Sequence, residues 1–144
     1  MADTYSVTFH YDKRGRGTLE LRHFDAVVCT EECRTGSVDV TGALVNALRP
    51  GRWYLCDDPM DTAEEAMVVN GVGWKMRLYE PDWYDRDVYH TTGYLIHPDG
   101  GRGGTLGCVG TQGPALTLRE ALRNARRLTD KGVLPLDVWK DSED

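Results

Sequence analysis

The chain has 144 residues, of which 40% are hydrophobic and 28% are charged. This composition is typical of one soluble globular domain and excludes a fibrous or disordered protein. Its 17 basic and 23 acidic side chains give a net charge of −6, which argues against nonspecific binding to nucleic acids or to anionic membranes. We therefore expect a single domain over residues 1–144, with no nucleic acid among its partners.

Targeting signals are missing from the sequence. No segment approaches the ~18 consecutive apolar residues of a membrane-spanning helix, so we expect no membrane insertion. The first residues, Met1 to Ser6, have neither the basic nor the apolar region of a secretory signal peptide. We expect synthesis in the cytoplasm. If the protein acts outside the cytoplasm, a dedicated secretion system or phage lysis would have to deliver it to the periplasm or the extracellular space.

The pattern of turns indicates a mainly β protein. The 16 glycines include Pro-Gly, Asn-Gly and Gly-Gly pairs that separate short apolar runs. Alternation of apolar and polar residues predicts, in chain order, strands over residues 5–11, 19–30, 52–56, 72–79, 94–97 and 133–139. Residues 42–48 fit either a short helix or a loop. Residues 63–68 fit a short helix behind the capping-box pair Asp61 and Glu64, and residues 80–87 an exposed loop long enough to act as a lid.

One amphipathic helix is expected in the C-terminal half. Thr117 is a suitable N-cap, Glu120 completes a capping box, and Gly132 follows the end of the pattern. One face collects apolar residues, namely Leu118, Ala121, Leu122, Ala125 and Leu128. The opposite face collects Arg119, Arg123, Arg126 and Arg127, which suits a solvated surface, with an anion-binding stripe as the alternative.

The four cysteines allow several readings. An even count is compatible with two disulfides, but a chain without a signal peptide gives that little support. Cys29 and Cys33 form a C-x3-C pair, which could be two unrelated thiols, a disulfide or redox pair, or part of a metal site. None of the four histidines has a partner at metal-ligand spacing, so we expect no metal and no cofactor.

The most informative segment runs from residue 93 to residue 110. A short strand ends at His97, and a glycine-rich stretch then leads to Cys108, which Gly107 precedes. Small neighbours leave a thiol accessible and allow backbone N–H groups to gather beside the sulfur, as the oxyanion of acyl transfer requires. A nearby imidazole can take the thiol proton, and His97 is close enough in sequence to do so. Asp99 or a backbone carbonyl could orient that imidazole.

This segment resembles the active-site signature of the L,D-transpeptidases (the YkuD-like catalytic fold). It is most similar to the compact branch found among antibacterial type VI secretion effectors and some phage proteins. That branch carries His-Pro-Asp-Gly and then Gly-Thr-x-Gly-Cys-Ile/Val-Gly, which matches residues 97–100 and 104–110. The match makes Cys108 the nucleophile and His97 the catalytic histidine, and Thr105 takes the position of a Ser/Thr.

Two positions depart from the family pattern. Leu106 stands where the common branch has a His, and Gly110 stands where an Arg is usual. The missing Arg leaves open how a substrate carboxylate or the loop itself is held. Arg102, or an arginine from elsewhere in the chain, could replace it.

The resemblance implies a β-sandwich of L,D-transpeptidase type with the C-terminal-half helix packed on it. It implies peptidoglycan stem peptides as substrate, with Cys108 attacking the third residue at its L-centre and expelling a terminal D-alanine. Transfer to an amine would be transpeptidation or D-amino-acid exchange, and transfer to water would be L,D-carboxypeptidase activity. The N–H groups of Gly107 and Cys108 would hold the oxyanion. Thr105, Tyr94, Arg102 and Gly104 would contact substrate, and an effector of this kind would have an immunity protein as partner.

Two other functions remain open. Small phage and prophage proteins carry a similar Gly-Cys loop without established catalysis, so the chain could be a structural or partner-binding module. That reading predicts a buried Cys108 with no His97 side chain within hydrogen-bonding distance. A cysteine peptidase acting on proteins is less favoured, because neither the papain-like nor the caspase-like cysteine context is present.

Overall fold

The computed structural model describes residues 4–100 and 105–141, with the backbone alone for Thr105 and Leu106. The strands are β1 (Tyr5–Tyr11), β2 (Arg16–His23), β3 (Ala26–Val38), β4 (Leu44–Val45), β5 (Gly51–Leu55), β6 (Met60–Asp61), β7 (Val68–Val69), β8 (Val72–Pro81), β9 (Tyr89–Pro98), β10 (Thr105–Thr111) and β11 (Leu134–Lys140). The helical segments are η1 (Glu65–Met67), α1 (Leu116–Leu128) and η2 (Asp130–Gly132).

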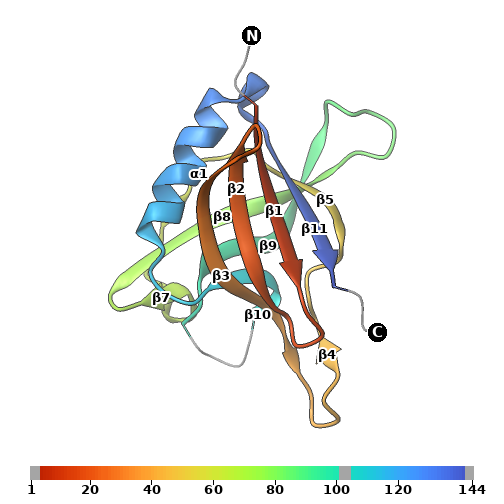
Figure 1. The fold of residues 1–144 in the computed structure, drawn as a ribbon, viewed down its shortest axis with the longest axis vertical. Helices are drawn as coiled ribbons and strands as arrows, with labels where there is room; N and C mark the ends of the chain where they lie inside the picture. The colour runs from red at the N-terminus through yellow and green to blue at the C-terminus, as the bar shows by residue number, and fades with distance from the viewer. Residues whose placement is uncertain (1–3, 101–104, 142–144) are drawn as a thin grey trace.

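Eight of the strands close into a barrel (Figure 1). Their order is β10, β9, β8, β5, β11, β1, β2, β3, and β3 pairs in turn with β10. The pairs β1–β11 and β9–β10 are parallel, and the other neighbours in the barrel are antiparallel. The mainly β prediction is confirmed. The expected two-sheet sandwich is replaced by a closed barrel, because β10 pairs on both of its sides and leaves no free edge between the sheets.

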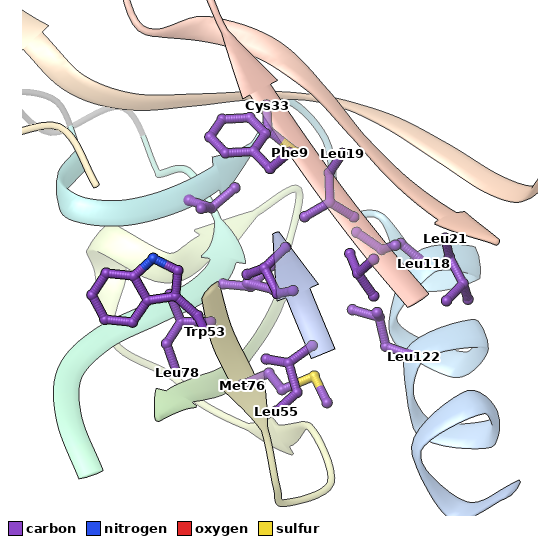
Figure 2. Close-up of a cluster of buried hydrophobic side chains, with 14 of the residues drawn as sticks. Phe9, Leu19, Leu21, Cys33, Trp53, Leu55, Met76, Leu78, Leu118 and Leu122 are labelled. Carbon is purple, nitrogen blue, oxygen red and sulfur yellow. The ribbon is translucent and has the colours of Figure 1, made fainter. Parts of the chain in front are cut away.

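The core fills the barrel with side chains from both ends of the chain (Figure 2). Strand alternation places every second residue inside, as with Val7 and Phe9 on β1 and Leu134 and Leu136 on β11. Trp53 is fully buried, and its indole N–H donates to the Arg49 carbonyl at 3.0 Å, so its one polar group is satisfied.

Helix α1 lies beside β3 and adds its apolar face to the same core (Figure 1). Leu118, Leu122 and Ala125 are buried as predicted, whereas Leu128 is half exposed. The helix begins at Leu116 rather than behind a Thr117 cap, because Ala115 adopts a left-handed conformation (φ 51°) and ends the preceding loop. Within the described residues, no helix is both long and apolar enough to cross a membrane.

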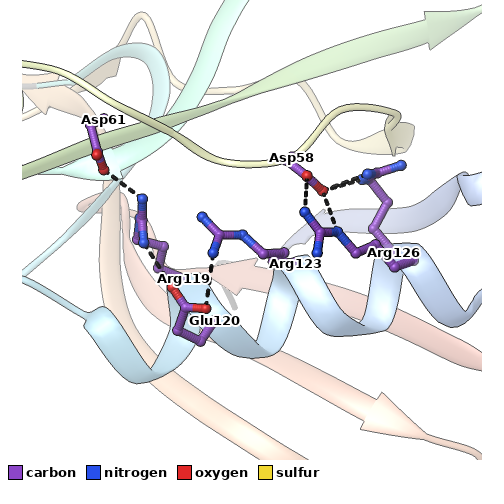
Figure 3. A network of polar contacts seen from close by, with 7 residues as sticks. Asp58, Asp61, Arg119, Glu120, Arg123 and Arg126 are labelled. Atoms are coloured by element: carbon purple, nitrogen blue, oxygen red, sulfur yellow. Dashed lines mark hydrogen bonds and ion pairs between the residues drawn. The ribbon is translucent and has the colours of Figure 1, made fainter.

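The arginine-bearing face of α1 is ion-paired rather than freely solvated (Figure 3). Arg126 and Arg127 both bond to Asp58, and Arg119 bonds to Asp61. Hydrogen bonds from Arg127 and Arg126 hold the pKa of Asp58 well below its usual range. The loop between β5 and β6 is thereby fastened to the helix.

Two other predicted segments differ in structure. Residues 63–68 contain the single turn η1 followed by β7, since Val68 pairs with Gly73 and continues as extended chain. Residues 42–48 form no helix, because Leu44 and Val45 pair with Val38 and Ser37. The β8–β9 connection is exposed as expected and projects from the barrel (Figure 1), with Trp83 and Tyr84 more than nine-tenths accessible.

Candidate functional site

Cys108 lies on strand β10, in parallel pairing with β9, and not in the glycine-rich turn where the sequence placed it. Val109 is opposite Ile96, and Gly110 is opposite His97. Pro98 fits at the end of this ladder because the neighbouring Asp99 supplies the N–H, which donates to the Thr111 carbonyl at 2.9 Å. The parallel pairing therefore brings the two segments that carry the predicted dyad side by side.

His97 and Cys108 occupy the same face of this sheet. Ile96 and Val109 are fully buried in the barrel core, so the residues that alternate with them point to the outer face. Those residues are Leu95 and His97 on β9 and Cys108 and Gly110 on β10. Cys108 is thus the diagonal neighbour of His97 across one pair of strands.

Gly107 shapes the backbone of β10 directly before Cys108. Its φ is +71°, and a Cβ atom there would lie 2.4 Å from Cε1 of Tyr94. Only glycine combines this conformation with so close a ring. The N–H of Gly107 donates to the Asn46 carbonyl at 2.6 Å, so it is already used and cannot serve as the predicted oxyanion donor in this conformation.

The N–H of Cys108 is the other oxyanion donor that the sequence predicts. The Thr111 carbonyl faces β9, and backbone groups of successive residues in a strand point alternately to the two sides, so the Cys108 N–H points toward β3. There the pairing of β10 with β3 is interrupted by a register shift between Thr105 and Gly110. Such an irregularity leaves strand N–H groups outside the regular ladder.

The Cys108 thiol is half-buried and accepts one hydrogen bond. The N–H of Leu95 donates to Sγ at 3.3 Å. Burial raises the pKa of the Cys108 thiol, and this N–H offsets the rise only in part. The resting group is therefore a neutral thiol at neutral pH, and attack on a carbonyl would need a base at the moment of reaction.

His97 is 6% exposed, and its orientation is set by a backbone carbonyl. Its Nδ1 lies 2.6 Å from the carbonyl oxygen of Pro98. A carbonyl oxygen can only accept, so Nδ1 carries the proton and Nε2 of the neutral ring is left as the acceptor. His97 and Cys108 make no hydrogen bond with each other in this structure, since the Leu95 N–H bonds to the thiol and the Pro98 carbonyl to the imidazole.

Asp99 follows β9 and is bound by Arg34 of β3. Arg34 Nε donates to Asp99 Oδ2, and the Asp99 side chain is only 11% exposed. Of the two orienting groups considered for His97, the Pro98 carbonyl makes the recorded bond to Nδ1. A catalytic role for Asp99 stays a prediction.

The predicted substrate-binding residues fall in different places. Tyr94 is turned toward the barrel side of β9, where its ring meets Trp53 edge-on at 5.8 Å between centroids, so it does not share a face with Cys108. Thr105 is opposite Gly36 of β3, and nothing is described of its side chain. Arg102 and Gly104 lie outside the described residues.

Two groups at the site are not indicated by the sequence, namely Arg34 and the Leu95 N–H, whereas a backbone carbonyl as partner of His97 was among the expectations. Arg34 is 65 residues from Asp99 in the chain, and no local pattern links the two. Leu95 also lines a hollow of about 260 Å³, together with Asp57, Asp58, Met60, Lys75 and Arg77.

The other cysteines stand apart from this site. All four thiols are free, and Cys29 and Cys33 are both on β3. Four residues of extended strand separate Cα atoms by ~13 Å, which is too far for a disulfide. The described residues contain no group of three His, Cys, Asp or Glu side chains placed to hold a metal ion.

Comparison of the chain with protein-family models, with curated proteins and with solved structures found no match.

Proposed function

We propose that this protein is a cysteine-dependent acyltransferase of L,D-transpeptidase type, acting on peptidoglycan stem peptides. One observation carries the proposal: Cys108 and His97 share one sheet face on adjacent parallel strands, with the imidazole held by a carbonyl so that Nε2 is the free acceptor. These are the requirements of a nucleophile and its general base. The resemblance of residues 97–110 to the family signature supplies the substrate class.

In the proposed reaction, His97 Nε2 takes the thiol proton as Cys108 Sγ attacks the carbonyl of the third stem residue. The N–H of Cys108 stabilises the oxyanion, and the Leu95 N–H steadies the sulfur as it gains charge. Collapse of the tetrahedral intermediate breaks the peptide bond, and His97 gives its proton to the departing amine of D-alanine. The thioester then passes its acyl group to an amine or to water, and the thiol is restored.

Delivery is part of the same proposal. A protein that acts on the cell wall must leave the cytoplasm, and we assign that step to a type VI-like secretion route or to phage lysis. An immunity protein would protect the producing cell.

The experiment is digestion of tetrapeptide muropeptides by purified, reduced protein, followed by mass spectrometry of the products. Release of D-alanine, or its exchange for an added D-amino acid, is expected from the wild type. Cys108→Ala should abolish it, and His97→Gln should lower the rate by about 10²–10⁴-fold. Cys56→Ser is the matched control, since Cys56 is also half-buried but is not part of the site. An unchanged muropeptide profile with folded wild-type protein would refute the proposal.

A non-catalytic, partner-binding module is the second candidate. It is favoured by the raised pKa of the Cys108 thiol and by the lack of a hydrogen bond between Cys108 and His97. Alkylation of Cys108 by iodoacetamide separates the two candidates. A dyad predicts that His97→Gln slows alkylation between pH 7 and pH 8 (about tenfold or more, as for loss of a general base). Equal rates in the wild type and the variant would favour the non-catalytic module.

A further inference from the structure

Four residues form a row across the outer face of the barrel, next to the thiol. Strand pairing places Gly110 opposite His97 on one side and opposite Arg34 on the other, and Arg34 is in turn opposite Arg16 of β2. Side chains of directly opposed residues lie on the same face of a sheet. The row therefore runs His97, Gly110, Arg34, Arg16, with Gly110 as its only member without a side chain.

The gap at Gly110 lets Arg34 extend across β10. Its Nε bonds to Asp99, at the end of the strand that carries His97. Within the described parts of the chain, no bond is recorded for the two terminal amino groups of Arg34, and none for the guanidinium of Arg16. These arginines line an open hollow of about 520 Å³ with Asp99 and Gln112, which we call the arginine hollow.

The arginine hollow is electropositive in an acidic protein. Among the described residues that line it, two guanidinium groups face one carboxylate, whereas the whole chain carries a net charge of −6. Glu32, two positions before Arg34 on β3, bonds to the Thr18 hydroxyl and is not among the residues that line the hollow. A guanidinium group with two free amino groups can bind a carboxylate through two parallel hydrogen bonds.

We propose that the arginine hollow binds the terminal carboxylate of the residue expelled by Cys108, with Arg34 as the main contact. The inference rests on the proposed function. The departing amine must lie beside His97 to receive its proton, and the carboxylate of the same residue is only two bonds beyond that nitrogen, within ~3 Å. Arg34 is the cation that reaches over Gly110 toward His97, so it meets the carboxylate there.

This binding makes a free C-terminus part of substrate recognition. A substrate that ends in an amide, or that continues past the expelled residue, brings no carboxylate to the arginine hollow. Such a substrate leaves the two guanidinium groups without their partner. The wild type should therefore prefer a free-acid tetrapeptide over its C-terminal amide by roughly 10- to 100-fold in kcat/KM, the range for one charge-assisted hydrogen bond.

The test compares the two substrates in the wild type and in Arg34→Gln, Arg34→Lys and Arg52→Gln. Arg34→Gln should lower kcat/KM for the free acid by roughly 10- to 100-fold and leave the amide nearly unchanged, which removes the preference. Arg34→Lys should keep part of it, because the charge remains. Arg52 is the matched control, a half-exposed arginine paired with Asp137 on β5 and β11. Thermal unfolding of each variant confirms that it is folded.

The outcomes separate the inference from the proposed function. Equal turnover of both substrates by the wild type refutes the carboxylate site and leaves the acyltransferase standing. Equal losses on both substrates in Arg34→Gln show that Arg34 only holds Asp99, and also refute the site; Asp99→Asn should then reproduce those losses. No turnover of either substrate by the folded wild type overturns the acyltransferase, and the inference with it.

Discussion

Replacement of Gly107 by alanine tests whether the backbone before Cys108 is shaped as described. The added Cβ would lie 2.4 Å from Cε1 and 2.7 Å from Cδ1 of Tyr94, in a residue whose φ is +71°. The left-handed conformation alone costs a non-glycine residue about 1–2 kcal/mol. Tyr94 is 39% exposed, so its ring can move away, at the loss of an edge-on contact with Trp53 that is worth about 0.5–1.5 kcal/mol.

We therefore expect Gly107→Ala to lower the free energy of unfolding by about 1.5–3.5 kcal/mol, measured by urea denaturation. In a Tyr94→Ala background the same change should cost only about 1–2 kcal/mol, because the ring is gone and the backbone conformation remains. Gly113→Ala is the control, since its Cβ would have no atom within 4 Å. A loss below about 0.5 kcal/mol for Gly107→Ala would refute both the strained conformation and the close ring.

Two further predictions concern ionisable groups away from the dyad. Arg126 and Arg127 hold the pKa of Asp58 below its usual range, so this carboxylate contributes stability above about pH 4 that is lost as the pH falls. Asp58→Asn should therefore reduce the free energy of unfolding by about 1 kcal/mol at pH 7 and by clearly less at pH 2.5 to 3, and an equal loss at both pH values would contradict the pairing. Burial raises the pKa of Cys33 far above that of a free thiol and raises the pKa of Cys56 to about 11. At pH 8, peptide mapping after alkylation should find Cys33 unmodified in the folded protein and modified in urea. Modification of Cys33 without urea would show that this thiol is not buried.

The local elements of this fold follow largely from the sequence, because their signals are periodic. Alternation along Tyr5–Tyr11 and Leu134–Lys140 marks strands that face a core on one side. The buried stripe of Leu118, Leu122 and Ala125 marks the helix. The sequence did not predict β10, because Thr105–Thr111 contains two glycines and little alternation of apolar and polar residues. The strand exists because β9 and β3 pair with it on both sides, which no local pattern records.

The two candidate catalytic residues could be named from the sequence, and their surroundings could not. A histidine before a glycine-rich stretch and a cysteine behind Gly107 are local patterns, so Cys108 and His97 were identified together. Which atoms serve them depends on chain segments far apart in sequence. The Asn46 carbonyl takes the Gly107 N–H, the Leu95 N–H meets the thiol, and partial burial raises the pKa of that thiol.

The sequence by itself determined that this is a small, acidic, mainly β protein with one amphipathic helix and a Cys-His pair set among glycines. Periodicity and side-chain chemistry are properties of short segments, and they survive without knowledge of the fold. Only the tertiary structure decided that the strands close into a barrel and that Arg34 lies opposite Gly110. The reason is physical: strand pairing joins residues by register rather than by distance along the chain, so an arginine on β3 can stand beside a position on β10 that carries no side chain.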